Sequence, residues 1–307
     1  MNTDILHQPG KHNQWSESFY FNWYDQTHDI CSFTRIGLTP NIKEKNMFLF
    51  FMLPQRKKLG IRDTKPLGTV STDDALMLSV NKLTFSKITN EKEWNISYDG
   101  TLLDPYQPDN PSVPVRFNLT FTGLHSMFNY RDCPISALQQ KLSEDVASEH
   151  LEQYGHVKGK LTIVDETFEI NALGERDHSW GIRKWTAPKQ WIWLTCQFNN
   201  DFAFNITKLT VAEGDIDAGF IHVDGKTHPI KQVSIDTAYS THHEPILFTL
   251  SMHTTTDKIF DIQASVKDKI HVPFNNGNDK SMMYENLAKY TYKNTVGYGI
   301  AEYLIKQ

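Results

Sequence analysis

The stretch QWIWLTCQFNNDFAFNITKL, residues 190–209, decides the class of fold. Two runs rich in aromatic and β-branched residues, 190–198 and 202–209, flank the polar turn Asn-Asn-Asp at 199–201. Such runs favour strands, and a short polar connection between them is typical of a β-hairpin. The stretch therefore predicts two neighbouring antiparallel strands.

Similar runs cover most of the chain on both sides of this hairpin. Turns that contain Gly, Pro, Asn or Asp separate them. The expected strands are residues 18–24, 31–36, 47–53, 75–83, 94–98, 115–122, 157–163, 169–173, 218–223, 230–239, 246–254, 260–266 and 296–304. Short strands at regular spacing with turn signals predict a β-sandwich or a β-barrel.

One segment breaks this pattern. Residues 136–154 place apolar side chains at roughly helical spacing, and Ser-Glu-Asp at 143–145 suits a helix start. Two strand-rich halves separated by one helix predict an all-β protein of two antiparallel β-barrel-like domains, packed together and joined by a linking helix. The expected domains are residues 1–154 and residues 155–307.

The overall composition argues against some partners. The 307 residues carry a formal net charge of −5 with a pI near 6.2, which gives no general attraction to nucleic acid. Aromatic residues make up 12% of the chain, and such residues favour pleated surfaces and line apolar pockets. We therefore expect a hydrophobic small molecule as the partner, and no nucleic acid.

The cysteines and the N-terminus indicate a compartment. Cys31, Cys133 and Cys196 are odd in number and far apart, without a CxxC pair or zinc-ligand spacing, so buried free thiols in a reducing compartment are expected. Residues 1–14 are polar, unlike a secretion signal, and the most apolar run, 47–53, is too short to cross a bilayer. We expect a cytoplasmic protein without a transmembrane segment.

The densest group of reactive side chains is GERDHSWGIRKW, residues 174–185. It contains acids, a histidine, a hydroxyl, two arginines and two tryptophans. Trp191 and Trp193 come soon after it, so four of the seven tryptophans fall between positions 180 and 193. Bulky aromatic groups beside ionisable groups favour a desolvated pocket, in which pKa values move and acid or base chemistry becomes possible near neutrality.

Strand geometry limits how this segment can work. In an extended chain alternate side chains share a face, so Asp177 and His178 face one cavity only if a β-bulge intervenes. We expect one face to carry Arg176, His178 and Trp180 and the other face to carry Glu175, Asp177 and Ser179. An alternative is structural, because Arg–Asp and Arg–Glu pairs beside Trp also seal barrel ends through buried hydrogen bonds. Residue types leave a site and a structural clasp equally open.

Residues 174–183 resemble a superfamily of two-domain, lipocalin-like proteins. It includes the carotenoid 1,2-hydratases (hydroxyneurosporene synthases), AttH-like proteins and some fungal Diels–Alderases, and the chain most resembles an uncharacterised bacterial branch with an Arg-Asp-His-Ser-Trp-Gly signature. Supporting fragments are residues 15–22, 35–37, 150–153 and 297–303. The resemblance implies two calycin-type barrels with an apolar cavity. With the domain boundary expected at residue 154, the signature would lie in the C-terminal domain.

The resemblance also implies a chemistry. The hydratases use a buried acid to protonate an isoprenoid double bond, with His and Trp nearby, and His178 and Trp180 match their His-x-Trp pattern. Their downstream Tyr-x-Asp, which supplies the acid, has no clear match, since residues 197–201 read Gln-Phe-Asn-Asn-Asp. That departure makes Asp177 the nearest substitute acid.

These observations lead to one functional hypothesis and one alternative. The hypothesis is an enzyme of the lyase or isomerase class, without a cofactor or metal, that acts on an isoprenoid- or polyketide-like molecule by acid-assisted hydration, cyclisation or isomerisation. Asp177 would donate the proton or orient His178, and His178 would be the acid or base. The expected substrate-binding residues are Arg176 and Arg183, which would anchor a polar end of the substrate, and Trp180, Trp185, Trp191 and Trp193. The alternative is a non-catalytic carrier or sensor of a lipophilic ligand.

Overall fold

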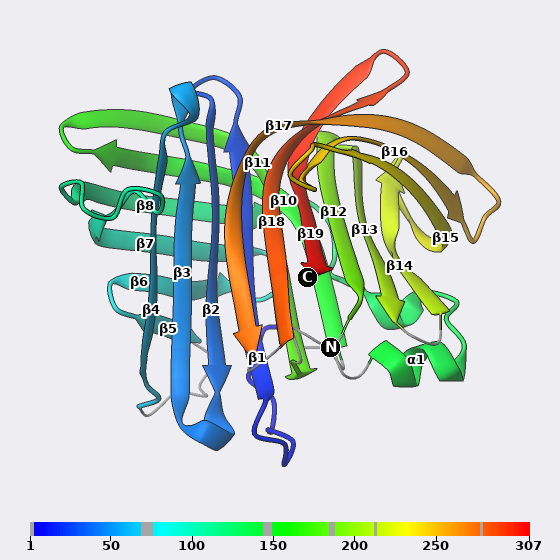
Figure 1. Ribbon diagram of the computed structural model, residues 1–307, viewed down its shortest axis with the longest axis horizontal. Helices are drawn as coiled ribbons and strands as arrows, with labels where there is room; N and C mark the ends of the chain where they lie inside the picture. The colour runs from blue at the N-terminus through cyan, green and yellow to red at the C-terminus, as the bar shows by residue number, and fades with distance from the viewer. Residues whose placement is uncertain (1–2, 69–75, 144–148, 184–187, 212–213, 277–278) are drawn as a thin grey trace. The chain divides into compact units, whose positions relative to one another are not determined.

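The computed structural model describes residues 3–68, 76–143, 149–183, 188–211, 214–276 and 279–307. Most of these residues are in β-strands, as Figure 1 shows. The chain divides into two compact units, Met1–Met127 with His150–Gly181 and Phe128–Glu149 with Ile182–Gln307. The predicted all-β class with two antiparallel, barrel-like sheets is confirmed.

The first unit is built on one sheet. Its strands are β1 (Trp15–Asp25), β2 (Ile30–Thr39), β3 (Glu44–Met52), β4 (Lys58–Pro66), β5 (Met77–Val80), β6 (Leu83–Thr89), β7 (Glu93–Leu102), β8 (Val113–Gly123), β10 (Glu149–Ile163) and β11 (Glu166–Ile182), with short 3-10 turns at Pro40–Ile42 and Pro54–Arg56. They are hydrogen-bonded in the order β4-β3-β2-β1-β11-β10-β8-β7-β6-β5. A bridge between Gly60 on β4 and Leu103, the residue after β7, curls the sheet toward a barrel.

Alternating side chains build the core of this unit. Phe19, Phe21 and Trp23 on β1 pack into one apolar cluster, and Ile170 and Ala172 on β11 join it. Because side chains alternate along a strand, the even-numbered residues of β11 face this core and the odd-numbered residues face away from it. This alternation fixes where the residues of the 174–185 segment point.

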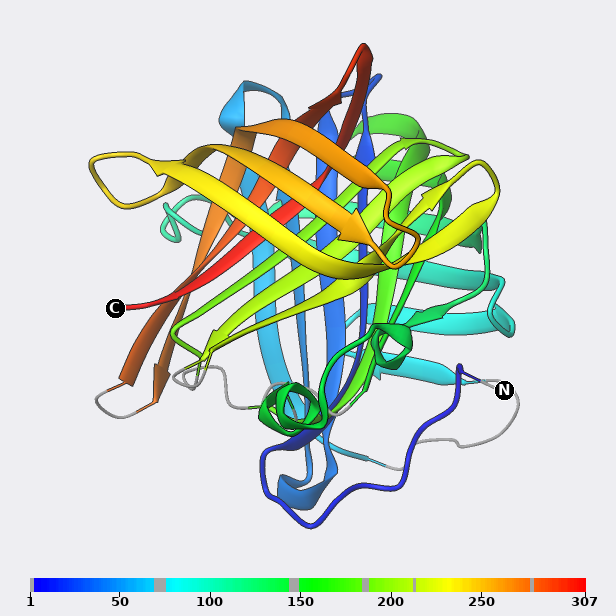
Figure 2. The same cartoon turned by 90° about the vertical axis from the view of Figure 1, so that its right-hand side faces the viewer.

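The second unit contains a closed barrel. The barrel strands are β12 (Gln190–Asn199), β13 (Phe202–Val211), β14 (Gly214–Val223), β15 (Lys226–Tyr239), β16 (Pro245–Thr254), β17 (Ile259–Asn276), β18 (Asp279–Tyr292) and β19 (Thr295–Lys306). The unit also contains β9 (Phe128–Asn129), a 3-10 turn (Tyr130–Asp132) and α1 (Ala137–Ser143), which are not part of the barrel. Strands β12 to β19 pair in sequence and β19 returns to β12, always antiparallel (Figure 2). The predicted hairpin at residues 190–209 is β12 and β13.

The linking helix is shorter than the sequence suggested. The helix was expected over residues 136–154. The structure describes α1 over Ala137–Ser143, residues 144–148, which include part of the expected start at 143–145, lie outside the described residues, and residues 150–154 belong to β10. Residues 155–163 pair with β8, which places them in the first unit. The unit boundary therefore differs from the expected boundary at residue 154, because β10 and β11 add to the sheet that the N-terminal strands form. The signature segment consequently lies in the first unit.

Two other expectations concern thiols and membranes. Cys31, Cys133 and Cys196 are buried thiols that take part in no disulfide of the described residues, as predicted. Burial raises the pKa of the Cys133 thiol to about 11. Within the described ranges, the chain has no helix with the length and apolar character that a membrane crossing requires.

Candidate functional site

Strand β11 presents the signature residues on two faces, as the pleat predicts. Arg176 and His178 continue the even-numbered register of Ile170 and Ala172, which faces the core of the first unit. Asp177 lies between them in the odd-numbered register and contacts His150 and Ser179. Asp177 and His178 therefore point to opposite faces, and this geometry does not support the expected role of Asp177 in orienting His178.

Arg176 is held by a buried carboxylate. Its side chain is 1% exposed, and its two terminal nitrogens lie 2.7 and 3.3 Å from the two carboxylate oxygens of Asp4. Its Nε donates to Gln153 Oε1 at 2.7 Å. The guanidinium also lies over the rings of Trp94 and Phe121, 5.7 and 6.0 Å from their centroids. This two-pronged pair anchors the N-terminal segment inside the first unit.

Asp4 is fully buried and remains ionised. Its Oδ2 accepts the backbone N–H of Glu91 at 2.7 Å and the indole N–H of Trp94 at 3.3 Å. Burial opposes ionisation of this carboxyl, but the charge and hydrogen bonds of Arg176 and the Glu91 N–H outweigh it and hold the pKa of Asp4 below its ordinary value. The pair is therefore an ion pair and not a neutral hydrogen bond.

His178 is the most enclosed member of the segment. Its side chain is fully buried and stacks on Phe19, with ring centroids 3.9 Å apart. Nδ1 lies 2.7 Å from the Thr3 carbonyl oxygen, and Nε2 lies 2.9 Å from Glu17 Oε1. Because the carbonyl can only accept, Nδ1 carries a proton. Both ring nitrogens are thus engaged inside the protein.

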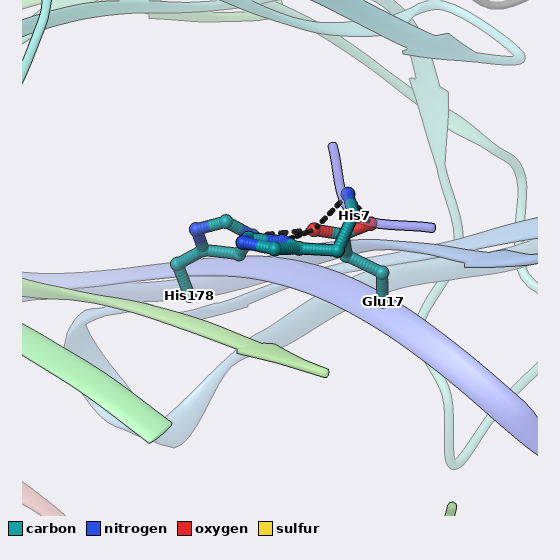
Figure 3. Close-up of side chains that lie close together, drawn as sticks. All are labelled: His7, Glu17 and His178. Carbon is teal, nitrogen blue, oxygen red and sulfur yellow. Dashed lines mark hydrogen bonds and ion pairs between the residues drawn. The ribbon is translucent and has the colours of Figure 1, made fainter. Parts of the chain in front are cut away.

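Glu17 brings a second histidine to the same point, as Figure 3 shows. Its Oε1 lies 2.7 Å from His7 Nδ1, and its Oε2 accepts the backbone N–H of His7 at 3.0 Å. Burial raises the pKa of Glu17, but the hydrogen bonds from His178 and His7 more than offset this and lower it below the ordinary value. The His7 ring stacks on Trp180, with centroids 3.6 Å apart.

Asp177 belongs to a different cluster. One of its oxygens contacts His150 Nε2, and the other accepts the Ser179 hydroxyl at 3.1 Å. Glu152 Oε1 lies 2.8 Å from the same His150 nitrogen. Glu152 is fully buried, and His150 and Asp177 are each less than a tenth exposed. Ser179 in turn contacts the Ser18 hydroxyl at 3.3 Å. One imidazole therefore lies between two buried carboxylates.

The remaining predicted residues are divided between the two units. Trp180 lies in the first unit against His7. Arg183 lies in the second unit and is buried, as are Trp191 and Trp193, which share one face of β12. Trp191 donates its indole N–H to the Thr207 hydroxyl at 2.9 Å. Trp185 lies outside the described residues.

A pair of glutamates in the second unit is chemically distinct. Glu285 on β18 and Glu302 on β19 are direct cross-strand partners, and Glu302 is also paired with Trp193 on β12. Burial and the nearby Glu302 charge raise the pKa of Glu285 well above its ordinary value. One carboxyl of this pair therefore stays protonated where exposed carboxyls are ionised.

Two groups in the described residues have the composition of a metal site. The first group is His7, Glu17 and His178, and the second is His150, Glu152 and Asp177. In each group the possible ligand atoms lie within 4.8 Å of one another. Of these six residues, the sequence pattern pointed only to His178 and Asp177. Glu17 and His150 occur in the fragments that carry the family resemblance, residues 15–22 and 150–153, so those fragments held a usable signal.

Comparisons with known proteins agree with this fold. A family model described as Domain of unknown function (DUF7064) matches residues 1–307, and no curated protein sequence matches the chain. CghA, crystallised with Sch210972, has a TM-score of 0.68 at 10% identity over 98% of this chain and 94% of its own. A putative AttH from Nitrosomonas europaea has a TM-score of 0.66 at 11% identity, and the match covers 99% of this chain and 98% of the AttH chain. Kievitone hydratase from Nectria haematococca has a TM-score of 0.63 at 12% identity, and the match covers 99% of this chain and 94% of the hydratase chain. The expected two-barrel fold is confirmed, while the superfamily and its signature-defined branch stay predictions.

The Asp4–Arg176 pair gives a stability prediction. Asp4→Asn leaves the buried guanidinium without its counter-charge, so the free energy of unfolding should fall by about 3–5 kcal/mol. The deficit relative to wild type should persist above the ordinary Asp pKa of 3.8 and shrink as the pH falls below it, because the pKa of Asp4 is lowered in the folded state. Denaturant titration at several pH values measures both effects.

The control is Glu169→Gln, which removes the acid of an ion pair with Lys160 in which both side chains are 71% exposed. Its effect should stay below about 1 kcal/mol. An Asp4→Asn variant as stable as this control would contradict the anchoring role of the pair.

The Glu285–Glu302 pair gives a pH prediction. The folded state retains a proton on Glu285 at pH values above 4.5, where the unfolded chain has lost it, so this residue makes stability fall as the pH rises. Glu285→Gln keeps a neutral side chain at every pH and should flatten this decline. Thermal unfolding between about pH 5 and about pH 8, the range into which burial shifts carboxyl groups, compares the slopes. A slope unchanged by Glu285→Gln would show that Glu285 ionises normally.

Proposed function

The chain belongs to the family Domain of unknown function (DUF7064), and we propose that it is an enzyme acting on a hydrophobic, isoprenoid- or polyketide-like small molecule by acid-assisted hydration, cyclisation or isomerisation. The observation that carries the proposal is the imidazole of His150 held between the buried carboxylates of Glu152 and Asp177. This cluster contains an acid and a base in one desolvated place, and the proposed chemistry requires no cofactor.

The cluster is suited to moving a proton. The imidazole of His150 can give up a proton to a bound molecule and take one back during one turnover, as general acid–base catalysis requires. Asp177 and Glu152 fix the ring and leave negative charge beside it after the proton departs. That charge stabilises a cation that forms on the substrate. Asp177 keeps the catalytic role expected from the sequence, but it orients His150 in place of His178.

The three reactions share their first step and differ in the fate of the cation. When a double bond of the substrate takes the proton, the cationic carbon is captured by water in a hydration or by a second double bond in a cyclisation. In an isomerisation, loss of a neighbouring proton to the cluster restores a double bond at a new position. The Ser18 and Ser179 hydroxyls contact each other, and Ser179 also contacts Asp177, so both are placed to hold water or a polar end of the substrate.

The comparisons support this class of substrate. One protein of similar fold is a kievitone hydratase by name, and another was crystallised with the small molecule Sch210972. Aromatic side chains suited to an apolar ligand are buried in the chain, among them Trp191 and Trp193. Arg176 is not assigned to the substrate, because Asp4 and Gln153 engage its guanidinium.

Mass spectrometry identifies the substrate class first. The freshly purified protein is examined by native mass spectrometry, any bound apolar compound is extracted and identified, and the protein is incubated with isoprenoid and polyketide polyenes while products are monitored by chromatography. We expect a compound bound at one per chain and a product that differs by added water or by rearrangement. Stoichiometric binding without conversion of any compound would indicate a carrier instead of an enzyme.

Variants then locate the chemistry. Asp177→Asn and His150→Gln should each lower turnover by about 10²–10⁴-fold, the usual contribution of a general acid or base, while ligand binding and the circular dichroism spectrum stay unchanged. Glu169→Gln, on the exposed part of β11, should keep full turnover. Full activity in Asp177→Asn would remove the cluster from the mechanism.

A further inference from the structure

The cluster on the other face of β11 has no part in the proposed function. It consists of His7, Glu17 and His178 (Figure 3). His7 Nδ1 and His178 Nε2 approach the same oxygen, Glu17 Oε1, at 2.7 and 2.9 Å. Two imidazole nitrogens thus approach one carboxylate oxygen, and the three ligand atoms lie within 4.8 Å of one another in a unit interior where Glu17 and His178 are at most 2% exposed.

If hydrogen bonds alone join these side chains, charged groups must be buried, and their desolvation costs much free energy. His178 already donates from Nδ1 to the Thr3 carbonyl oxygen, so a hydrogen bond from Nε2 to Glu17 requires a doubly protonated, charged ring. A buried imidazolium–carboxylate pair loses the hydration of both ions. A divalent cation in the same position binds the lone pair of a neutral Nε2 and the carboxylate together, and it leaves the Thr3 hydrogen bond intact.

Each ligand is also oriented by a second partner, as in established metal sites. Metal-binding histidines usually donate their other ring N–H to a carbonyl or carboxylate, and His178 does so to Thr3. The second oxygen of Glu17 accepts the backbone N–H of His7. The His7 ring is fixed by stacking on Trp180. These contacts hold the three ligand atoms in place without using the atoms themselves.

The ligand set favours zinc. Imidazole nitrogens and one carboxylate are typical zinc ligands, with a fourth position taken by water. A tetrahedral ion about 2.1 Å from each ligand sets the ligand atoms about 3.4 Å apart, so the side chains need to separate only slightly. The His7 side chain is 24% exposed, which gives the ion a route from solvent.

We propose that His7, Glu17 and His178 bind one zinc ion, which fastens the N-terminal segment to β1 and β11. His7 lies on that segment, Glu17 on β1 and His178 on β11, so the ion joins three separate parts of the chain. Binding free energy at such a site adds to the stability of the folded state. The role is structural, and it is independent of the His150 cluster.

The test is a zinc titration of the full chain. The protein is stripped with a chelator, dialysed, and titrated with zinc sulfate by calorimetry, and the metal content is measured by mass spectrometry. We expect one zinc per chain and a higher unfolding temperature in the presence of zinc. His7→Gln should weaken zinc binding by more than about 100-fold, beyond the loss typical of a residue that only orients a ligand. Since His7 is partly exposed, this variant is expected to fold.

Two controls make the result specific. His12→Gln, on the same N-terminal segment and exposed, should keep wild-type zinc affinity. His150→Gln should also keep it, because His150 belongs to the other cluster. Absence of zinc binding at micromolar free zinc would overturn the proposal, and so would binding that His150→Gln abolishes while His7→Gln retains it.

Discussion

The buried ion pair between Arg176 and Asp4 is the interaction on which the first unit depends. A guanidinium that is 1% exposed cannot be left without a counter-charge, so the position of Arg176 on β11 determines where Asp4 must lie. Asp4 in turn fixes the segment around it. The Thr3 carbonyl then reaches His178, and His7 reaches Glu17. The charge of Arg176 in the middle of β11 thus holds the N-terminal residues against the rest of the first unit.

The alternation of side chains along β11 separates two tasks within one short segment. The core-facing residues Arg176 and His178 have partners that hold the unit together. Asp177, between them, meets His150 on the other side, where Glu152 also lies. The structural clasp that the sequence left as one alternative is therefore formed by one face of the strand, and the catalytic site that we propose occupies the opposite face. A dense run of polar residues in a strand has this general consequence, since neighbours in sequence cannot share an environment.

The sequence was informative about local patterns and uninformative about distant partners. Alternation and turn residues were enough to predict the β12–β13 hairpin and the separation of Asp177 from His178. Residues 150–154 were expected in a helix, because their apolar spacing fits a helical period as well as a strand. These residues form a strand because β10 pairs with β8 and β11 in the sheet, and no local sequence signal reveals that pairing. The same pairing places residues 155–181 in the first unit.

Asp4 and His7 were missed for a related reason. They lie in a polar N-terminal segment with no strand pattern, and their importance comes from distant contacts, such as the one between Asp4 and Arg176, which are 172 positions apart. Sequence spacing carries no trace of such a contact. Glu17 was detectable in principle, because a charged residue next to an aromatic strand is unfavourable to bury and must have a partner.

The most direct test of this assignment of faces is nuclear magnetic resonance of the histidine rings. Protein labelled with nitrogen-15 at histidine is recorded with and without an apolar compound that it binds, and His150→Gln and His178→Gln assign the two resonances. The assignment predicts that the ring signals of His150 shift on binding while those of His178 stay in place. Shifts of His178 with unchanged His150 signals would contradict it and would place the ligand on the core-facing side of β11.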